Sequence, residues 1–176
     1  MNKLADYNLA IEVRAARELP IKLRRELELW FDEQFSRTGI RWAKPGWYIL
    51  ARHGTRIVGR VGIFRRTIAV GKRKIRVGGL GGVITRERWR RRGVTAHMLV
   101  TAHRVMRDIL RCEHGLLLCA RDVAPVYEGA GWKLVDGPTS YMQGSSKMTY
   151  RNLTMVLRLA RHRWPAGPID FRGLPW

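Results

Sequence analysis

The chain changes its hydrophobic pattern abruptly at three consecutive arginines, Arg90, Arg91 and Arg92, which Gly93 follows. Residues 80–85 form an apolar run before them, and apolar residues recur at helical spacing over 94–110. This order predicts a strand that turns through a short glycine loop into the N-terminus of a helix. The unpaired amides of the first helical turn, the positive end of the helix dipole and the arginines all favour an anion at one point. The segment therefore predicts a diphosphate-binding loop.

A second pattern lies downstream, at residues 116–132. Residues 116–120 indicate a short apolar strand, after which Pro125 can start a helix and Gly131 can end it. Tyr127 then falls on the first turn of that helix, and a new strand begins at Trp132. The distance between the two patterns suits one compact domain.

Together the two patterns resemble the GNAT superfamily of N-acyltransferases. The phosphate loop of that superfamily reads Arg/Gln-x-x-Gly-x-Gly/Ala, and its later segment reads Tyr-x-x-x-Gly-Phe/Trp. Residues 90–95 match the first pattern, with Thr95 in place of the usual small residue, and residues 127–132 match the second. The resemblance implies an α/β fold of the GNAT type. Its mixed central sheet is flanked by helices, and its fourth and fifth strands splay apart to admit an acyl thioester.

Two branches of the superfamily resemble the chain most. Residues 51–83 are similar to the nodulation-factor N-acyltransferases. The same region, with residues 89–90, 126–132, 137–140 and the tryptophan at 176, is similar to the aminoglycoside 2′-N-acetyltransferases. The second match covers the larger part of the chain, but it does not specify an aminoglycoside as the substrate.

The resemblance implies acetyl-CoA, or another acyl-CoA, as cosubstrate. The residues expected to contact it lie at the end of the central strand and in the arginine loop: Val83, Ile84, Thr85, Arg90, Arg91, Arg92, Gly93, Val94, Thr95 and Ala96. Backbone amides near 83–85 would polarise the thioester carbonyl, which requires no particular side chain. The resemblance assigns Tyr127 as the general acid that protonates the departing thiolate, because a phenol is a neutral donor near neutral pH.

The acceptor side departs from the aminoglycoside enzymes. Those enzymes carry a carboxylate on the central strand where this chain has Gly81, and an aspartate where it has Leu174. A polycation needs an acidic site, so an aminoglycoside acceptor is not expected. The residues expected to border the acceptor are Asp32, Glu33, Gly81 and Trp176.

The base that removes a proton from the amine is left open. Gly81 cannot take a proton, so the alternatives are His53, His97, Asp170 and solvent. The glycines of the central strand, at 78, 79, 81 and 82, either leave room for a bulky ligand or mark a bulge.

Charge is the least ordinary property of the composition. The chain carries 34 lysines and arginines against 14 acidic residues, which gives a formal net charge of +20. A charge this far from zero attracts polyanions, so an acidic partner, either acyl carrier protein or nucleic acid, is one expectation. The other is that the arginines serve no partner and the acceptor is a small-molecule amine. A homodimer is a further alternative.

Length and hydrophobicity favour a single domain over residues 1–176, with an irregular tail from about 162. No apolar run approaches the ~20 residues of a membrane helix, and the first residues lack the form of a signal peptide. We therefore expect a cytoplasmic protein without a membrane span. Cys112 and Cys119 are expected to be core thiols, and no metal site is expected, because their spacing matches no zinc or redox motif.

The hydrophobic periodicity also predicts the secondary structure. Strands are expected at 7–13, 47–52, 57–70, 74–85, 115–120, 132–135 and 148–159, and helices at 21–35, at 94–110 and from Pro125. A hairpin turn at Gly71 and Lys72 should join the two long strands. Residues 37–46 and 137–147 are expected to be loops.

Four functions are compatible with these residues. The first is a CoA-dependent N-acetyltransferase for a small primary amine, and the second is an N-acyltransferase that takes a longer acyl group from acyl carrier protein. The third acts on nucleic acid or on an amine bound to it. The fourth is a catalytically weak GNAT scaffold that binds nucleic acid, which Gly81 favours and which the retained Arg90, Gly93 and Tyr127 oppose.

Overall fold

The structure is a computed structural model and describes residues 8–176. Ten strands and three α-helices make up this part of the chain. In order they are β1 (Leu9–Ala15), α1 (Ile21–Phe35), β2 (Trp47–His53), β3 (Arg56–Val70), β4 (Arg73–Thr85), α2 (Val94–Arg104), β5 (His114–Cys119), α3 (Ala124–Glu128), β6 (Lys133–Leu134), β7 (Thr139–Gln143), β8 (Ser146–Tyr150), β9 (Leu153–Arg158) and β10 (Ile169–Asp170).

The strands form one mixed sheet. Its main path runs β6-β9-β5-β4-β3-β10-β7-β8, and β2 pairs with both β3 and β1. The pairs are antiparallel except for β4 with β5 and β10 with β7, which are parallel. The expected α/β fold with a mixed central sheet is confirmed.

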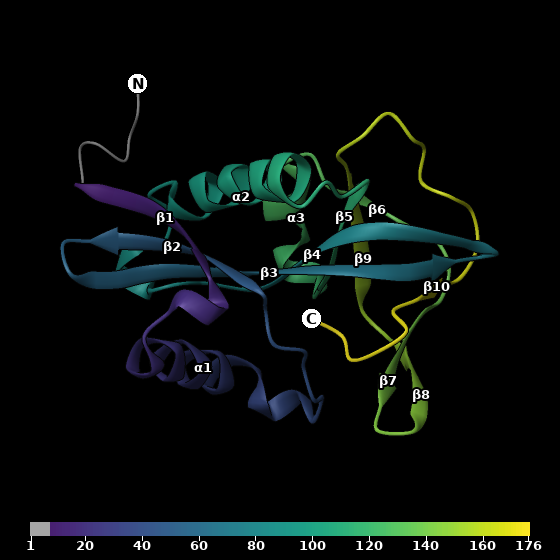
Figure 1. The fold of residues 1–176 in the computed structure, drawn as a ribbon, viewed down its shortest axis with the longest axis horizontal. Coiled ribbons are helices and arrows are strands. Elements are labelled where there is room, and N and C mark those ends of the chain that lie inside the picture. Colours follow the sequence, from purple (N-terminus) through teal and green to yellow (C-terminus); the bar gives the residue numbers. More distant parts are fainter. Residues whose placement is uncertain (1–7) are drawn as a thin grey trace.

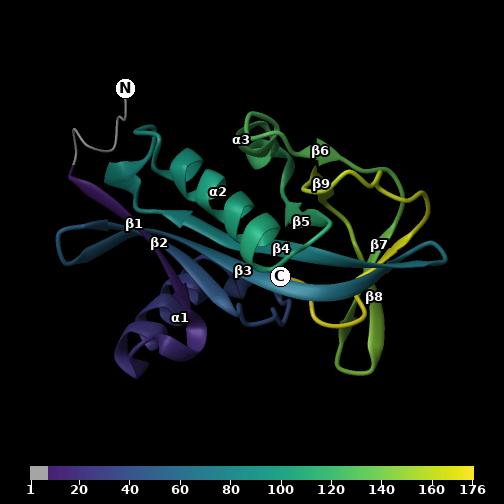
Figure 2. The ribbon, with the colours of Figure 1, turned by 45° about the horizontal axis from the view of Figure 1, so that its top comes forward.

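Helices cover both faces of the sheet, with α1 on one side and α2 and α3 on the other (Figures 1 and 2). Strand β2 shows why both faces are apolar. Tyr48 and Leu50 belong to the core cluster beneath α1, whereas Ile49 and Ala51 belong to the cluster beneath α2. Successive side chains of a strand point to opposite faces, so a continuous apolar run buries the strand on both sides.

The β3–β4 hairpin is the centre of the sheet. Its turn is at Gly71 and Lys72, as expected, and its register is regular up to the pair Gly62 and Gly81. The register then shifts, so that Val61 lies opposite both Gly82 and Val83. Gly82 has a φ of +56°, and the extra residue is a β-bulge. Of the two expectations for the glycines of this strand, the bulge is therefore confirmed.

The fourth and fifth strands separate as expected. Strands β4 and β5 pair in parallel only where Val77–Leu80 faces His114–Leu117. Beyond that ladder β4 continues to Thr85 and β5 to Cys119 without pairing to each other. The gap between these strand ends is where the resemblance puts an acyl thioester.

Two expectations about the C-terminal half are wrong. Residues 137–147, expected to be a loop, contain β7, which forms a hairpin with β8 around Gly144 at a φ of +60°. The single strand expected over 148–159 is two strands, interrupted at residues 151–152, because β8 pairs with β7 whereas β9 pairs with β5 and β6.

The expected irregular tail is ordered where it meets the sheet. Ile169 and Asp170 form β10, which inserts between β3 and β7. After it, Phe171 and Trp176 are buried, with exposed fractions of 0% and 3%. The yellow segment in Figure 1 returns in this way to the middle of the molecule.

Other boundaries need small corrections. The helix expected over 94–110 is α-helical to Arg104 and ends in a π-helical turn, Val105–Ile109. The first strand begins at Leu9 and runs to Ala15; Tyr7, its expected start, lies outside the described residues. Cys112 and Cys119 are buried free thiols, as expected, and burial raises the pKa of each to about 11.

Candidate active site

A cavity of about 600 Å³ opens where β4 ends, and we call it the donor cavity. Its walls come from the end of β4, the arginine turn, the first turn of α2 and the start of α3. It brings together Val83, Ile84, Thr85, Arg90, Arg91, Gly93, Val94, Thr95, Ala96 and Tyr127, all of which the sequence singled out. Gln34, Trp89, Val123 and Val126 complete the wall, and none of these four was expected.

The turn before α2 has the geometry that an anion site needs. Gly93, the N-cap of α2, has a φ of +79°, which side chains other than glycine rarely tolerate. The amides at the start of the helix have no partner within the helix. Thr95 Oγ1 lies 2.9 Å from Thr85 Oγ1, so the departure from the usual small residue ties the helix start to β4.

The arginines of the turn are arranged differently from one another. Arg90 and Arg91 are exposed and line the donor cavity, and Arg90 Nε donates to the carbonyl of Thr85 at 3.2 Å. The guanidinium of Arg92 lies 5.4 Å from the ring centroid of Trp89 and is outside the cavity wall. Two cations and a helix N-terminus thus face the same space.

Tyr127 enters the donor cavity from α3. Burial raises the pKa of its hydroxyl, and Cys119 and Tyr150 act in the same direction. The phenol therefore keeps its proton at neutral pH. The ring also packs edge-on to Trp132, with centroids 6.5 Å apart, so the side chain has a structural as well as a potential chemical role.

A second cavity, of about 160 Å³, is lined by residues of α1, β3 and β4, and we call it the acceptor cavity. Gly81 and Gly82 line it, whereas the next residue, Val83, lines the donor cavity. Helix α1 contributes Asp32 to this wall. Glu33 is exposed and is not part of the wall. Along β4 the wall of the acceptor cavity therefore ends at the bulge, and that of the donor cavity begins at the next residue.

Trp176 explains why position 81 is glycine. The main-chain carbon of Trp176 lies 2.8 Å from the place that a Cβ on Gly81 would occupy. The indole covers Gly79 and donates from Nε1 to the carbonyl of Leu116 at 3.0 Å. A carboxylate side chain at position 81 has no room. Trp176 is itself absent from the walls of both cavities.

The three side chains proposed as the base line neither of the two cavities, so solvent is the alternative that remains. The ring of His53 packs against that of Trp89 at an interplanar angle of 44°, with centroids 4.9 Å apart, and His97 Nδ1 lies 2.9 Å from the carbonyl of Gly93. Asp170 accepts a hydrogen bond from Lys147 at 2.7 Å.

Arg60 is a further residue that the sequence did not indicate as part of the site. It is 2% exposed and lines the acceptor cavity from β3. Its one signal in the sequence is a charge inside the apolar run at 57–64, within the strand expected over 57–70. Within residues 8–176, no group of three or more His, Cys, Asp or Glu side chains could hold a metal ion.

Comparison with known proteins agrees with this geometry. The family model described as acetyltransferase (GNAT) domain matches residues 28–135, a span that contains β4, the arginine turn and Tyr127. No helix within the described part of the chain is long and apolar enough to cross a membrane.

Solved structures share the fold at low sequence identity. The chain is similar to Escherichia coli ElaA, with 12% identity, a TM-score of 0.64 and coverage of 85% of this chain and 99% of that one. It is also similar to the E. coli GNAT family N-acetyltransferase YhbS, solved in complex with CoA, with 16% identity and a TM-score of 0.57. That match covers 94% of this chain and 91% of YhbS. An acyl-CoA N-acyltransferase from Pseudomonas aeruginosa is similar with 11% identity and a TM-score of 0.60, over 85% of this chain and 99% of that one. Since the family match spans more than half of its length, the chain belongs to the GNAT acetyltransferase family.

Proposed function

We propose that the chain transfers an acetyl group from acetyl-CoA to the primary amine of a small-molecule acceptor. The observation that carries the proposal is the wall of the donor cavity, where the unpaired end of β4, the arginine turn and Tyr127 face one space. GNAT proteins use acyl-CoA as cosubstrate, and the similar YhbS was crystallised with CoA. The cosubstrate supplies an activated acyl group in a thioester.

Each part of the cavity has a separate task in this scheme. The amides at the start of α2, with Arg90 and Arg91, bind the diphosphate. The free edge of β4 pairs with the amides of the pantetheine chain in the manner of an added strand. Backbone amides at 83–85 donate to the thioester carbonyl and stabilise the negative charge that develops on its oxygen.

Proton transfer completes the reaction. The neutral amine attacks the carbonyl carbon, a C–N bond forms and the C–S bond breaks. Tyr127 gives its hydroxyl proton to the departing sulfur. The acylated nitrogen releases one proton to solvent, and Tyr127 regains one from solvent, so the products are an amide and a free thiol.

Calorimetry of acetyl-CoA binding tests the cosubstrate site. Replacing Arg90 and Arg91 together by alanine should weaken binding at least about tenfold, because each removes a charge-assisted contact. The matched control is Arg25→Ala, since Arg25 is an exposed arginine of α1 away from the cavity. Unchanged affinity in the double variant would refute the diphosphate site.

A second proposal concerns the source of the acyl group. Four arginines, Arg52, Arg56, Arg86 and Arg88, line a pocket of about 540 Å³ between α1 and the β2–β3 hairpin, and we call it the arginine pocket. It shares Trp89 with the donor cavity. An acidic surface docked there would lie beside the thioester site, which favours acyl carrier protein as an alternative donor.

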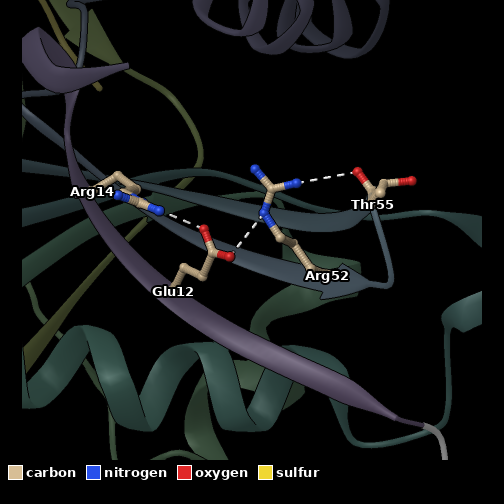
Figure 3. Close-up of polar contacts among 4 residues, drawn as sticks. All are labelled: Glu12, Arg14, Arg52 and Thr55. Atoms are coloured by element: carbon tan, nitrogen blue, oxygen red, sulfur yellow. Dashed lines mark hydrogen bonds and ion pairs between the residues drawn. The ribbon is translucent and has the colours of Figure 1, made fainter. Parts of the chain in front are cut away.

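Two arginines of this pocket are held in place. Figure 3 shows Arg52 between Glu12, 3.0 Å from its Nε, and the carbonyl of Thr55, to which Nη1 donates at 3.1 Å. Arg86 lies 4.6 Å from the ring centroid of Trp30 and donates to a backbone carbonyl. Cations held in this way lose little conformational entropy when an anion binds.

The branch of the GNAT family to which the chain is related bears on its acceptor. We propose that its resemblance to the aminoglycoside 2′-N-acetyltransferases and the nodulation-factor N-acyltransferases reflects a common scaffold and not a common acceptor. Arg60 in the wall of the acceptor cavity supports this view, because a buried cation opposes a polycationic substrate.

A further inference from the structure

Arg60 is a buried cation in the wall of the acceptor cavity. Its guanidinium lies between two aromatic rings, 5.3 Å from the centroid of Phe31 and 5.1 Å from that of Tyr48. Nη1 donates to the backbone carbonyl of Leu27. These contacts fix the side chain but provide no carboxylate in direct contact with it; Asp32 and Glu28 act on the guanidinium only through space. Burying a charge without a direct partner is costly.

One edge of the guanidinium lacks a partner. Nε forms no hydrogen bond with any of residues 8–176, and Arg60 forms no ion pair within that range. Nη2 lies against Gly82, where a Cβ would be only 2.8 Å from it. Nε and Nη2 are the two parallel donors on one side of the planar fork, and such a pair matches the two oxygens of a carboxylate.

The other charges of the cavity point to a second group on the ligand. Glu28 and Asp32 both line it from α1. Glu28 is paired with Lys44 at 3.1 Å, whereas Asp32 is exposed and forms no ion pair among the described residues. The cavity therefore presents a buried cation in its wall and, near solvent, a carboxylate that has no ion-pair contact and acts on that cation through space.

We infer that the acceptor is a small amino acid or a similar amine that carries a carboxylate, which pairs with the guanidinium of Arg60 in the wall of the acceptor cavity. Asp32 holds the ammonium group before it loses its proton. This inference rests on the proposed function, because it names the substrate class of the same site. A cavity of about 160 Å³ with Phe31, Trp42 and Phe64 in its wall fits a short ligand with an apolar side chain.

The location of the cavity supports delivery of the amine to the thioester. Gly81 and Gly82 border the acceptor cavity, and Val83 borders the donor cavity. A molecule held by Arg60 therefore lies next to the segment of β4 that would bind the thioester carbonyl.

Matched pairs of amines test the inference on the unmodified protein. L-Phenylalanine is compared with 2-phenylethylamine, and L-alanine with ethylamine, so that each pair differs by one carboxylate. Binding is measured by ligand-observed NMR without CoA, and turnover by release of free thiol from acetyl-CoA. The amino acid of at least one pair should bind at least about tenfold more tightly than its partner, as expected for a charge-assisted hydrogen bond. Equal or weaker binding of the amino acids in both pairs would overturn the inference.

Variants of Arg60 locate the effect. Arg60→Met should abolish the preference for the carboxylate, and Arg60→Lys should retain only part of it, because lysine lacks the planar fork. Arg25→Met, on the exposed face of α1, is the matched control and should keep the preference. If Arg60→Met shows no cooperative thermal unfolding by circular dichroism, Arg60→Lys and the comparison on the unmodified protein decide.

The outcomes separate the inference from the proposed function. If the protein binds acetyl-CoA and acetylates only the amines without a carboxylate, the proposed function stands and the inference falls. If the protein does not bind acetyl-CoA, the proposed function falls, and NMR binding of the amino acids in the absence of CoA still decides whether Arg60 binds a carboxylate.

Discussion

At the scale of single residues, burial sets the protonation of the groups that matter. Tyr127 lines the donor cavity, and its burial raises the pKa of its hydroxyl. The hydroxyl therefore stays protonated and can act as an acid but not as a base. His103 is also kept uncharged by its surroundings, at a site unrelated to the cavities. Tyr127 leads to a prediction about the rate of acetyl transfer, and His103 to one about the pH dependence of stability.

Tyr127→Phe should lower the rate of acetyl transfer by roughly 10²-fold, because the thiolate loses its proton donor, and should leave acetyl-CoA affinity nearly unchanged. Single-turnover kinetics and calorimetry measure the two effects. Tyr141→Phe, at a buried tyrosine outside both cavities, is the control and should keep full activity. A parallel loss of binding and turnover would make Tyr127 a structural residue, and full activity would give the proton to water.

His103 should make stability depend on pH. Its Nε2 accepts a hydrogen bond from Trp132 Nε1 at 3.0 Å. Burial, reinforced by Arg107, lowers the pKa of the ring to about 4 in the folded state, against about 6.5 in the unfolded chain. The folded state is therefore favoured above the unfolded pKa, and this contribution is lost as pH falls from about 6.5 towards 4.

Thermal unfolding followed between pH 7 and pH 4, a range of about three units around these pKa values, checks this prediction. His103→Gln keeps an acceptor for Trp132 but does not titrate, so its melting temperature should fall less with acid than that of the parent. His53→Gln serves as control, because His53 is exposed. Parallel pH profiles for the parent protein and His103→Gln would contradict the assignment.

At the scale of elements, the arginine turn illustrates how one backbone angle supports a binding site. At Gly93 the nearest atoms to an added Cβ would be those of the His97 ring, 3.7 Å away. Space is therefore available, and the constraint is the φ of +79° alone. A β-branched residue cannot hold that conformation without strain, so the amides of the turn would move away from the diphosphate.

Gly93→Val should weaken acetyl-CoA binding at least about tenfold, measured by calorimetry. Gly39→Val is a matched control, since Gly39 also has a positive φ, +65°, with nothing within 4 Å, and lies outside the donor cavity. It should lose stability but retain its affinity. If both variants bind acetyl-CoA like the parent, the turn does not bind the diphosphate.

The elements also differ in how well the sequence predicts them. Helix α1 and the β3–β4 hairpin follow from local signals, namely helical spacing and the Gly71 turn, and were predicted almost to the residue. Strand β7 was not found in this way, because three of its five residues, Thr139, Ser140 and Gln143, are polar, and because one of its two partners, Ile169–Asp170, is distant in the chain. The candidate residues of the donor cavity came from motifs, whereas Arg60 acquires its surroundings from α1, including a carbonyl 33 residues earlier.

At the scale of the whole molecule, the net charge of +20 is not needed for a single CoA. Part of it is concentrated in the arginine pocket, beside the donor cavity. Charges that face one another across a docking interface raise the association rate and lose their effect as salt increases.

If an acidic partner docks at the arginine pocket, replacing Arg56 and Arg88 by glutamine should weaken its binding and flatten the salt dependence between about 50 and 200 mM. The control replaces Arg73 and Lys74 by glutamine as well and should bind the partner like the parent. These two residues are exposed at the turn of the β3–β4 hairpin. Nucleic acid should give the steeper salt dependence, because it releases condensed counterions, and acyl carrier protein the shallower. If neither nucleic acid nor acyl carrier protein binds at the lower salt, no acidic partner docks at the arginine pocket, and a small-molecule acceptor is the proposal that stands.

The bulge at Gly82 sets which face of β4 each later residue serves. In a regular strand the parity of the residue number decides the side on which a side chain lies. One extra residue reverses that parity, so positions before and after Gly82 follow opposite rules. Deleting Gly82 would therefore restore ordinary alternation, with Gly81 still opposite Gly62 and Ile84 still opposite Arg60. The extra residue lengthens β4 by one position between the wall of the acceptor cavity and that of the donor cavity, while the pairing on either side of it is kept.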